Sequence, residues 1–100
     1  MIYIKKNYTQ PFSLKELSDA IGKNAYYILR IFKEINGVTP LQYLHLLRIS
    51  KAQKLLIETN MSVTNIAFDV GYNDSTQFSI NFKKYTGLTP SEFRVNLTDS

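Results

Sequence analysis

The feature that most constrains the fold of this chain is an internal repeat. The stretch 13–22 aligns with the stretch 62–71, 49 residues later, and their apolar positions coincide. Beyond them the spacing becomes 50 residues, and Phe-Lys, Gly and Thr-Pro recur in the same order, at 32–33, 37 and 39–40 and again at 82–83, 87 and 89–90. All four glycines occupy paired positions. Chance would match single apolar letters but not this ordered series, so we infer two copies of one structural unit.

The first copy predicts two short helices joined by a tight turn. Ser13 and Glu16 have the spacing of a capping box, in which a hydroxyl and a carboxylate cover the first free amides of a helix. Gly22 can take the left-handed conformation that ends this helix, and Asn24 is suited to cap the next one. Apolar residues at helical spacing predict the inward faces: Leu14, Leu17, Ile21, Tyr27, Ile28, Ile31, Phe32 and Ile35.

The second copy predicts the same arrangement. Gly71 marks its turn, either Asn73 or Asp74 caps the following helix, and Gly87 ends that helix. Two helices joined by a tight turn with glycine form a helix-turn-helix element. The predicted inward residues of this copy are Val63, Ile66, Ala67, Val70, Phe78, Phe82 and Tyr85.

A third kind of element lies between the copies. Thr39, Pro40 and Gln42 are typical of a helix start, and neither glycine nor proline interrupts the stretch from Leu41 to Glu58. A helix of that length would be about 27 Å long. Its leucines can touch both copies, so we expect a rigid linker. The predicted fold is all-α with about seven helices, including one over 2–8, and divides into a first unit (10–40), a linker helix (41–58) and a second unit (59–97).

Composition excludes several classes of protein. The chain has no cysteine, which excludes disulfides and cysteine-based zinc sites. A single histidine, His45, leaves at most one base for a catalytic dyad. The apolar runs are far shorter than a membrane span, and the first residues lack the order of a signal peptide. We therefore expect a cytoplasmic protein that is not an enzyme, holds no cofactor or metal, and does not bind membranes. The net charge of +4 is compatible with an acidic partner.

The second helix of each copy leaves a polar face opposite its inward face, and such a face fits the major groove of DNA. Arginine can donate two parallel hydrogen bonds to guanine, hydroxyls can bond base edges, and apolar side chains can reach thymine methyl groups. Lysines and helix N-termini fit phosphates. The predicted base-facing residues are Tyr26, Leu29, Arg30, Ser75, Thr76, Ser79 and Ile80, and the predicted phosphate contacts are Asn24, Lys33, Asn73, Lys83 and Lys84.

These faces also admit simpler interpretations. Arginine and lysine on a helix more often mark a solvated face, and Leu29 and Ile80 could belong to the core or to a protein interface. The alternative function is therefore an all-helical protein–protein interaction module. His45 is expected to cap a surface or to hydrogen-bond locally, with no functional role, and Asp74 to cap a helix rather than to act as a catalytic carboxylate. The repetition favours DNA, because two copies on one linker can meet the same partner twice.

Two longer motifs carry a family resemblance. The first copy contains Tyr27-Ile28-x-Arg30-x-Phe32-Lys33, and the second ends with Gly87-x-Thr89-Pro90-Ser91-Glu92-Phe93-Arg94. Together with the sequence between them, they resemble the AraC/XylS class of bacterial transcription regulators, from about Ile2 to Arg94. The resemblance implies a DNA-binding domain of seven helices and two subdomains. Its recognition helices, about 24–36 and 75–86, would enter successive major grooves of a bipartite site on double-stranded DNA, through the base-facing positions named above.

The sequence departs from that family at two base-facing positions. The family often has arginine where this chain has Ile80, and a polar residue where it has Leu29. Because both changes remove hydrogen-bonding groups, we expect Arg30 to discriminate between bases more than the second copy does. Members usually carry a regulatory portion ahead of this domain, and the chain resembles the C-terminal part of YesN-type response regulators. We therefore expect a longer protein with an N-terminal receiver or ligand-binding domain, and RNA polymerase as a further partner.

Overall fold

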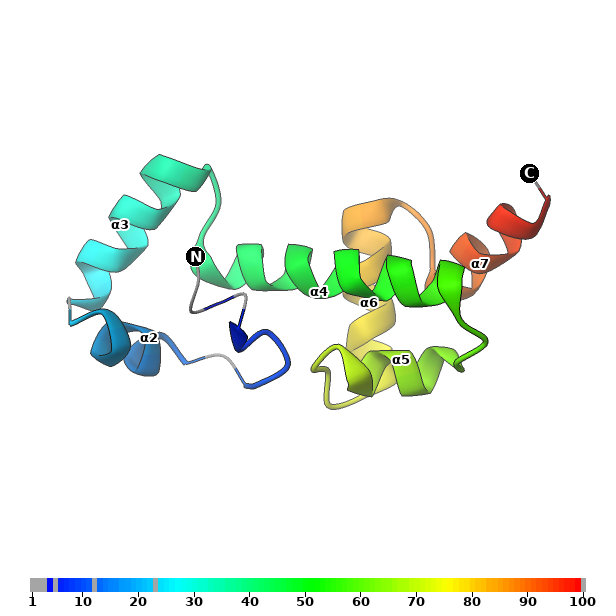
Figure 1. Ribbon diagram of the computed structural model, residues 1–100. Helices are drawn as coiled ribbons and strands as arrows, with labels where there is room; N and C mark the ends of the chain where they lie inside the picture. The colour runs from blue at the N-terminus through cyan, green and yellow to red at the C-terminus, as the bar shows by residue number, and fades with distance from the viewer. Residues whose placement is uncertain (1–3, 5, 12, 23, 100) are drawn as a thin grey trace.

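The computed structural model describes residues 4, 6–11, 13–22 and 24–99. Within them the chain is all-helical, with no strand, and Figure 1 shows the elongated molecule, which measures 47 × 22 × 21 Å. A first helical pair, α2 and α3, lies toward one end of the long α4, and a second helical pair, α5 and α6, lies with α7 toward the other. This confirms the predicted all-α fold of two helix-turn-helix elements and a linker helix. The helices are α2 (Leu14–Ile21), α3 (Ala25–Asn36), α4 (Pro40–Glu58), α5 (Val63–Asp69), α6 (Ser75–Thr86) and α7 (Pro90–Asp99).

The helix predicted over 2–8 is shorter than expected. Ile4 and Lys6 are helical, but residues 7–10 form bends and turns. Hydrogen bonds from the Asn7 amide to the Ile4 carbonyl (3.3 Å) and from the Gln10 amide to the Asn7 carbonyl (3.0 Å) close these turns. Residues 2, 3 and 5 lie outside the described part of the chain.

Side-chain caps set the helix boundaries, as the sequence predicted. Thr39 and Gln42 exchange both hydrogen bonds of a capping box, at 2.9 and 3.2 Å, so α4 begins at Pro40, the first helical position indicated by the sequence and one residue before the linker bound at 41. Between the two candidates for the cap of α6, the structure selects Asp74, whose carboxylate accepts a backbone amide at 2.7 Å. Asn73 precedes the cap. These signals are local in the chain, which is why the sequence alone could locate the helices.

The repeat is also visible in the packing. The Phe32 and Tyr43 rings meet edge-on, with centroids 5.6 Å apart and planes at 77°. Fifty residues later, Phe82 and Phe93 meet in the same way, with centroids 5.4 Å apart and planes at 73°. In each case the ring on the second helix of a pair contacts the ring on the helix that the Thr-Pro motif begins. The two copies therefore share a packing geometry as well as a sequence pattern.

The core is concentrated around the second helical pair. Helix α4 contacts α5, α6 and α7, and α6 also contacts α7, so this pair is covered by two further helices. Tyr8, Met61 and Phe93 are among the partly buried side chains that pack against this core. The buried core cluster consists of Ile49, Ala52, Leu56, Ile66, Ala67, Val70, Tyr72, Phe78 and Phe82.

The first helical pair is covered less, and three residues predicted to face inward are exposed. The side chains of Ile21, Tyr27 and Ile35 retain 50%, 44% and 75% of their exposure, so the prediction is wrong for them. The reason is that α3 packs on α2 and α4, whereas α6 packs on α5 and α7 and also on α4, so the second pair is covered by one described helix more than the first. Ile28, on the same side of α3, is buried. Helical periodicity identifies the apolar face but not how far a neighbouring element extends over it.

Candidate nucleic-acid interface

The outward face of α3 consists of Tyr26, Arg30 and Lys33. These three exposed side chains follow one another at one-turn spacing, opposite the buried side of the helix. Leu29 flanks them and is half-buried, so only part of its side chain is accessible to a partner. The Arg30 guanidinium carbon lies 6.0 Å from the centroid of the Tyr27 ring, at the outer limit of a cation–π contact. The structure thus brings three predicted residues of the first copy onto one accessible face.

The outward face of α6 consists of Thr76, Ile80 and Lys83. All three side chains are exposed, and that of Ile80 retains 56% of its exposure, opposite the buried phenylalanines of the same helix. Ser75 and Ser79 lie at the margins of this face and are half-buried. An exposed isoleucine on a helix with a well-filled core is not needed for packing, which leaves it free to contact a partner.

The two outward faces occupy equivalent positions in the repeat but differ in chemistry. Lysine is present in both, as Lys33 and Lys83. The residue one turn earlier is Arg30 in α3 and Ile80 in α6. Arginine can donate two hydrogen bonds to a guanine edge, whereas isoleucine can offer only an apolar contact. The second face compensates in charge, because the exposed Lys84 follows Lys83 and carries its ammonium group 5.4 Å from the centroid of the Tyr85 ring.

The starts of the two outward helices differ in what they offer a phosphate. At α3, Asn24 Oδ1 accepts the amides of Tyr26 and Tyr27 at 2.8 and 3.3 Å. Those amides are engaged, so the group of Asn24 suited to a phosphate is its Nδ2 amide. At α6 the cap is the Asp74 carboxylate, which places a negative charge beside Asn73. Because the Asp74 carboxylate would repel a phosphate bound at Asn73, we expect Asn73 to be a weaker phosphate contact than Asn24.

Gln77, an exposed residue in the first turn of α6, is not among the base-facing residues predicted from the sequence. It borders a hollow of about 520 Å³, lined also by Thr9, His45 and Asp74, between the N-terminal segment, α4 and the start of α6. A glutamine amide can pair with adenine through two hydrogen bonds. The signal was available: a helical projection that places Phe78 and Phe82 inward puts position 77 on the exposed flank.

His45 does not bond locally, contrary to the prediction. Its Nδ1 lies 2.8 Å from the hydroxyl of Tyr72, 27 residues away, and its ring stacks with those of Tyr72 and Tyr85 at centroid distances of 5.7 and 6.5 Å. Burial, then the positive charges of Arg48 and Lys84, lower the pKa of His45, so it is neutral at pH 7. Burial raises the pKa of Tyr72 to about 12, so its hydroxyl keeps its proton. His45 therefore links the linker helix to the second helical pair.

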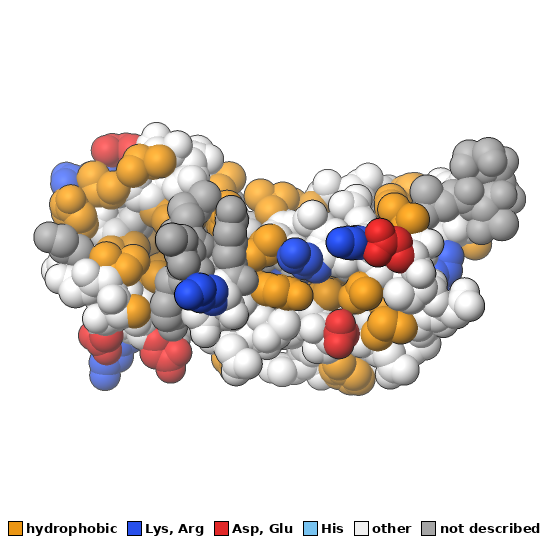
Figure 2. All heavy atoms as spheres, in the orientation of Figure 1, with side chains coloured by type: hydrophobic (Ala, Val, Ile, Leu, Met, Phe, Trp, Pro, Cys, Tyr) orange, Lys and Arg blue, Asp and Glu red, His pale blue; other side chains and the backbone are white. Residues whose placement is uncertain are grey.

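Charge on the face where α4 lies in front is mixed. Figure 2 shows Lys and Arg side chains over α4 with Asp and Glu side chains close by, together with apolar patches. Among the described residues visible on this face, the positive side chains are therefore interspersed with negative and apolar ones. The cations aligned on the outward faces of α3 and α6 are Arg30, Lys33 and Lys83, with Lys84 adjacent.

The part of the chain that the structure describes lacks two other features, a metal-binding cluster and a membrane-spanning helix. No group of three or more His, Asp or Glu side chains there could hold a metal ion. No helix there combines the length and the apolar character needed to cross a bilayer.

Comparison with known proteins agrees with this geometry. Residues 17–96 match a family described as a helix-turn-helix domain. Over 92 residues the chain is 40% identical to the bifunctional transcriptional activator/DNA repair enzyme AdaA of Bacillus subtilis (strain 168), covering 92% of this chain but 44% of that protein. The C-terminal domain of the two-component response regulator yesN from Fusobacterium nucleatum superposes with a TM-score of 0.87 at 34% identity, covering 92% of this chain and 90% of that one.

A transcriptional regulator with an AraC-type DNA-binding domain from Chromobacterium violaceum superposes with a TM-score of 0.84 at 27% identity, covering 93% of this chain and 83% of that one. These similarities extend over both helical pairs and the linker helix. The chain belongs to the AraC family of helix-turn-helix DNA-binding domains.

Proposed function

We propose that this chain binds double-stranded DNA with sequence specificity, as the DNA-binding part of a bacterial transcription regulator. The observation that carries the proposal is the pair of equivalent outward faces on α3 and α6, joined by one linker helix. Each face combines a lysine with side chains that suit base edges. The names of the relatives support it, since one is a transcriptional activator and another a two-component response regulator.

In this proposal the units 10–40 and 59–97, joined by the linker 41–58, insert α3 and α6 into successive major grooves. Grooves on one side of a straight duplex recur about every 34 Å, or about 10 bp. A helix of 19 residues such as α4 is about 28 Å long. Because the linker is shorter than the groove repeat, we expect either that the duplex bends toward the protein or that one of the two helices sits loosely in its groove.

The proposed contacts divide into two classes. Contacts to base edges carry sequence specificity, and contacts to phosphates position the protein. We assign base edges to Tyr26, Leu29, Arg30, Ser75, Thr76, Ser79 and Ile80, with Gln77 added, and phosphates to Asn24, Lys33, Asn73, Lys83 and Lys84.

The activity of the whole protein is a further part of the proposal. Because this chain spans 44% of AdaA, the repair activity in that protein's name is not transferred to it. We propose a non-enzymatic domain that acts in the bacterial cytoplasm, at the nucleoid. Within a longer regulator it would answer to an N-terminal receiver or ligand-binding domain, and RNA polymerase would be a further partner.

Selection of bound duplexes from a random pool tests the proposal. The expected result is a bipartite consensus with two specified blocks about 10 bp apart, because two helices read two grooves. Affinity for the best selected duplex should exceed that for a scrambled duplex of the same composition. Equal affinities for the two duplexes would overturn the proposed sequence specificity.

A further inference from the structure

The segment 7–11, which we call the entry segment, leads into the first helical pair but lies against the second. Figure 1 shows it running beneath α4, between the two pairs. The Tyr8 side chain packs against the core cluster of the second pair, and its ring centroid lies 6.0 Å from Lys51 Nζ on α4. Only two residues separate Gln10 from Ser13, the cap of α2, so this cap lies within about 11 Å of Gln10.

Arg48 of α4 holds the backbone of the entry segment. Its side chain is only 6% exposed. Its Nε donates to the Tyr8 carbonyl at 2.6 Å, and its Nη2 donates to the Gln10 carbonyl at 2.7 Å. The guanidinium carbon also lies 5.2 Å from the centroid of the Tyr72 ring. A buried guanidinium requires such partners, because an unsatisfied buried charge is strongly destabilising.

Gly71, in the turn of the second helical pair, provides the other side of this contact. A Cβ at Gly71 would lie 2.8 Å from Thr9 Cα and 2.9 Å from the Tyr8 carbonyl oxygen. Gly22, its equivalent in the first copy, also has positive φ, but nothing lies within 4 Å of a Cβ there. The turn conformation alone therefore leaves open space at this position. The close contact at Gly71 arises because the entry segment lies against it.

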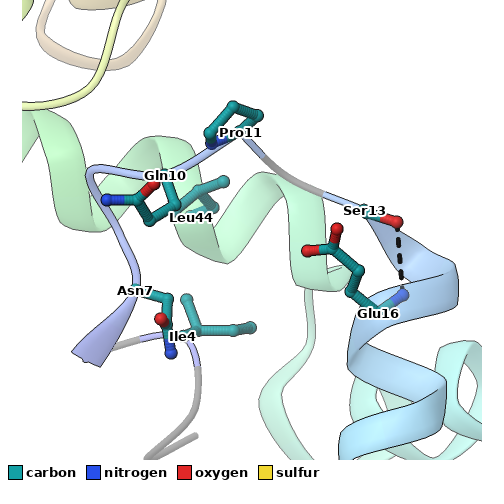
Figure 3. A pocket seen from close by; sticks show the side chains of 7 residues that line it. All are labelled: Ile4, Asn7, Gln10, Pro11, Ser13, Glu16 and Leu44. Carbon is teal, nitrogen blue, oxygen red and sulfur yellow. Dashed lines mark hydrogen bonds between the residues drawn. The ribbon is translucent and has the colours of Figure 1, made fainter.

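The first helical pair has loose packing on the side where the entry segment meets it. A hollow of about 240 Å³ lies among Asn7 and Gln10 of the entry segment, Glu16 at the start of α2, and Leu44 of α4. Figure 3 shows these side chains around the hollow. Atoms that line a void lose contacts on one side. Side-chain packing here therefore restrains α2 less than a filled core would.

We propose that the entry segment, held by Arg48 and Gly71, fixes the separation and orientation of the two outward helices and so determines which spacer length in DNA the protein accepts. The inference rests on the proposed function, because a spacer preference presupposes two DNA-contacting faces. Arg48 is a positioning residue in it, since its hydrogen bonds reach backbone carbonyls of the entry segment. A one-base-pair change displaces a half-site by about 3.4 Å and rotates it by about a tenth of a turn. If the entry segment holds the first helical pair in place, α3 cannot follow this displacement and rotation of its half-site.

The first test measures spacer tolerance. Starting from the duplex selected by the unaltered protein, the spacer is lengthened or shortened by one and two base pairs, and Kd is measured for each. We expect a loss of about tenfold or more per base pair for the unaltered protein, comparable to mismatches in one half-site. Arg48→Met keeps an apolar stem against Tyr72 but removes the donors, and Gly71→Ala displaces Thr9. Both should flatten the profile to losses of a few-fold.

Two matched controls separate positioning from general destabilisation. Arg94 donates to the carbonyls of Leu56, Thr59 and Met61 at 3.3, 3.3 and 2.7 Å, all outside the first helical pair. Arg94→Met should therefore lower stability without changing the spacer profile. Gly87→Ala introduces a side chain at positive φ with no atom within 4 Å, so it carries the backbone cost of Gly71→Ala without the displacement. It too should leave the profile unchanged.

A second measurement works without DNA. The chain has no cysteine, so Glu34→Cys and Lys83→Cys place two spin labels on α3 and α6 specifically. The distribution of label distances should broaden with Arg48→Met and Gly71→Ala, but not with the two controls. An unchanged distribution in folded variants overturns the inference even if DNA binding is confirmed. If the unaltered protein instead binds no duplex specifically, the proposed function fails while the distance measurement still decides the inference. If Arg48→Met does not fold, the inference is decided by comparing the spacer profile and the label distances of Gly71→Ala with those of Gly87→Ala.

Discussion

Replacing Arg30 with alanine should reduce discrimination at one base pair in the first half-site. A bidentate arginine–guanine pair is worth about 1–3 kcal/mol of discrimination. Arg30 is exposed, and its guanidinium carbon lies 6.0 Å from the centroid of the Tyr27 ring. When the guanidinium moves into the groove it loses this cation–π contact, which is worth about 0.5–1 kcal/mol. We therefore expect Arg30→Ala to weaken binding to DNA that carries the preferred base pair by about 1–2 kcal/mol, which raises Kd about 5- to 30-fold.

Ile80 occupies the equivalent position on α6 and should behave differently. It has no hydrogen-bonding group, and 56% of its side chain is already exposed before any partner binds. Ile80→Ala removes an apolar contact that can distinguish bases through one thymine methyl, so we expect less than about 1 kcal/mol of altered preference. Ile80→Arg should instead create a guanine preference in the second half-site, because the repeat places that side chain as it places Arg30.

The assay is a set of duplexes in which each base pair of the selected site is changed in turn to the other three. The ratio of Kd values for the preferred and altered base pairs is measured for the unaltered protein, Arg30→Ala, Ile80→Ala and Ile80→Arg. Circular dichroism and thermal unfolding establish that each variant is folded. Equal shifts in base preference for Arg30→Ala and Ile80→Ala would refute the reasoning that the first face discriminates more.

The remaining predictions concern salt, charge, pH and local stability. Lys33→Ala and Lys83→Ala should each lower the slope of log K against log salt concentration by about one without altering base preference, measured by titrations at several salt concentrations; a changed preference would contradict the phosphate role. Asp74→Asn should keep the cap and tighten DNA binding by removing a negative charge, whereas Asp74→Ala should cost about 1 kcal/mol of stability in urea unfolding. Because the pKa of His45 lies below 6.5 in the folded protein, the unfolded chain binds more protons as the pH falls below that value. The histidine contribution to the free energy of unfolding should thus be complete above about pH 6.5 and decline below it, a difference that His45→Gln should abolish. Hydrogen exchange should be faster in α3 than in α6, because fewer buried contacts protect the first helical pair.

Much of the fold could be predicted because its signals are local. A cap lies within three residues of the amide it covers, so Thr39 and Gln42 located the start of α4 to within one residue. The outward faces followed from the same locality: once Phe78 is inward, the opposite positions on α6 are determined by helical geometry. The residues assigned to bases and phosphates stay predictions, since their roles depend on a partner.

Other features could not be predicted because they depend on what lies nearby in space. Ile35 has the spacing of a core residue, yet it is exposed because no described element covers the end of α3. His45 meets Tyr72 across 27 residues, and Arg48 meets the entry segment across about 40. No periodicity reports such pairs. The repeat even misleads here, because it makes Gly22 and Gly71 equivalent although only Gly71 touches another segment.

The differences between the copies lie where each meets something outside itself. Their internal packing is shared, as the edge-on ring pairs show, because each copy must bury the same helix-turn-helix. The face that would meet DNA differs, with Arg30 in one copy and Ile80 in the other. The turn also differs, open at Gly22 and filled by the entry segment at Gly71. The second pair, with its larger core, can act as the platform on which the first is oriented. Discrimination between bases then depends most on the less rigid pair, so whatever orients that pair also governs which DNA is read.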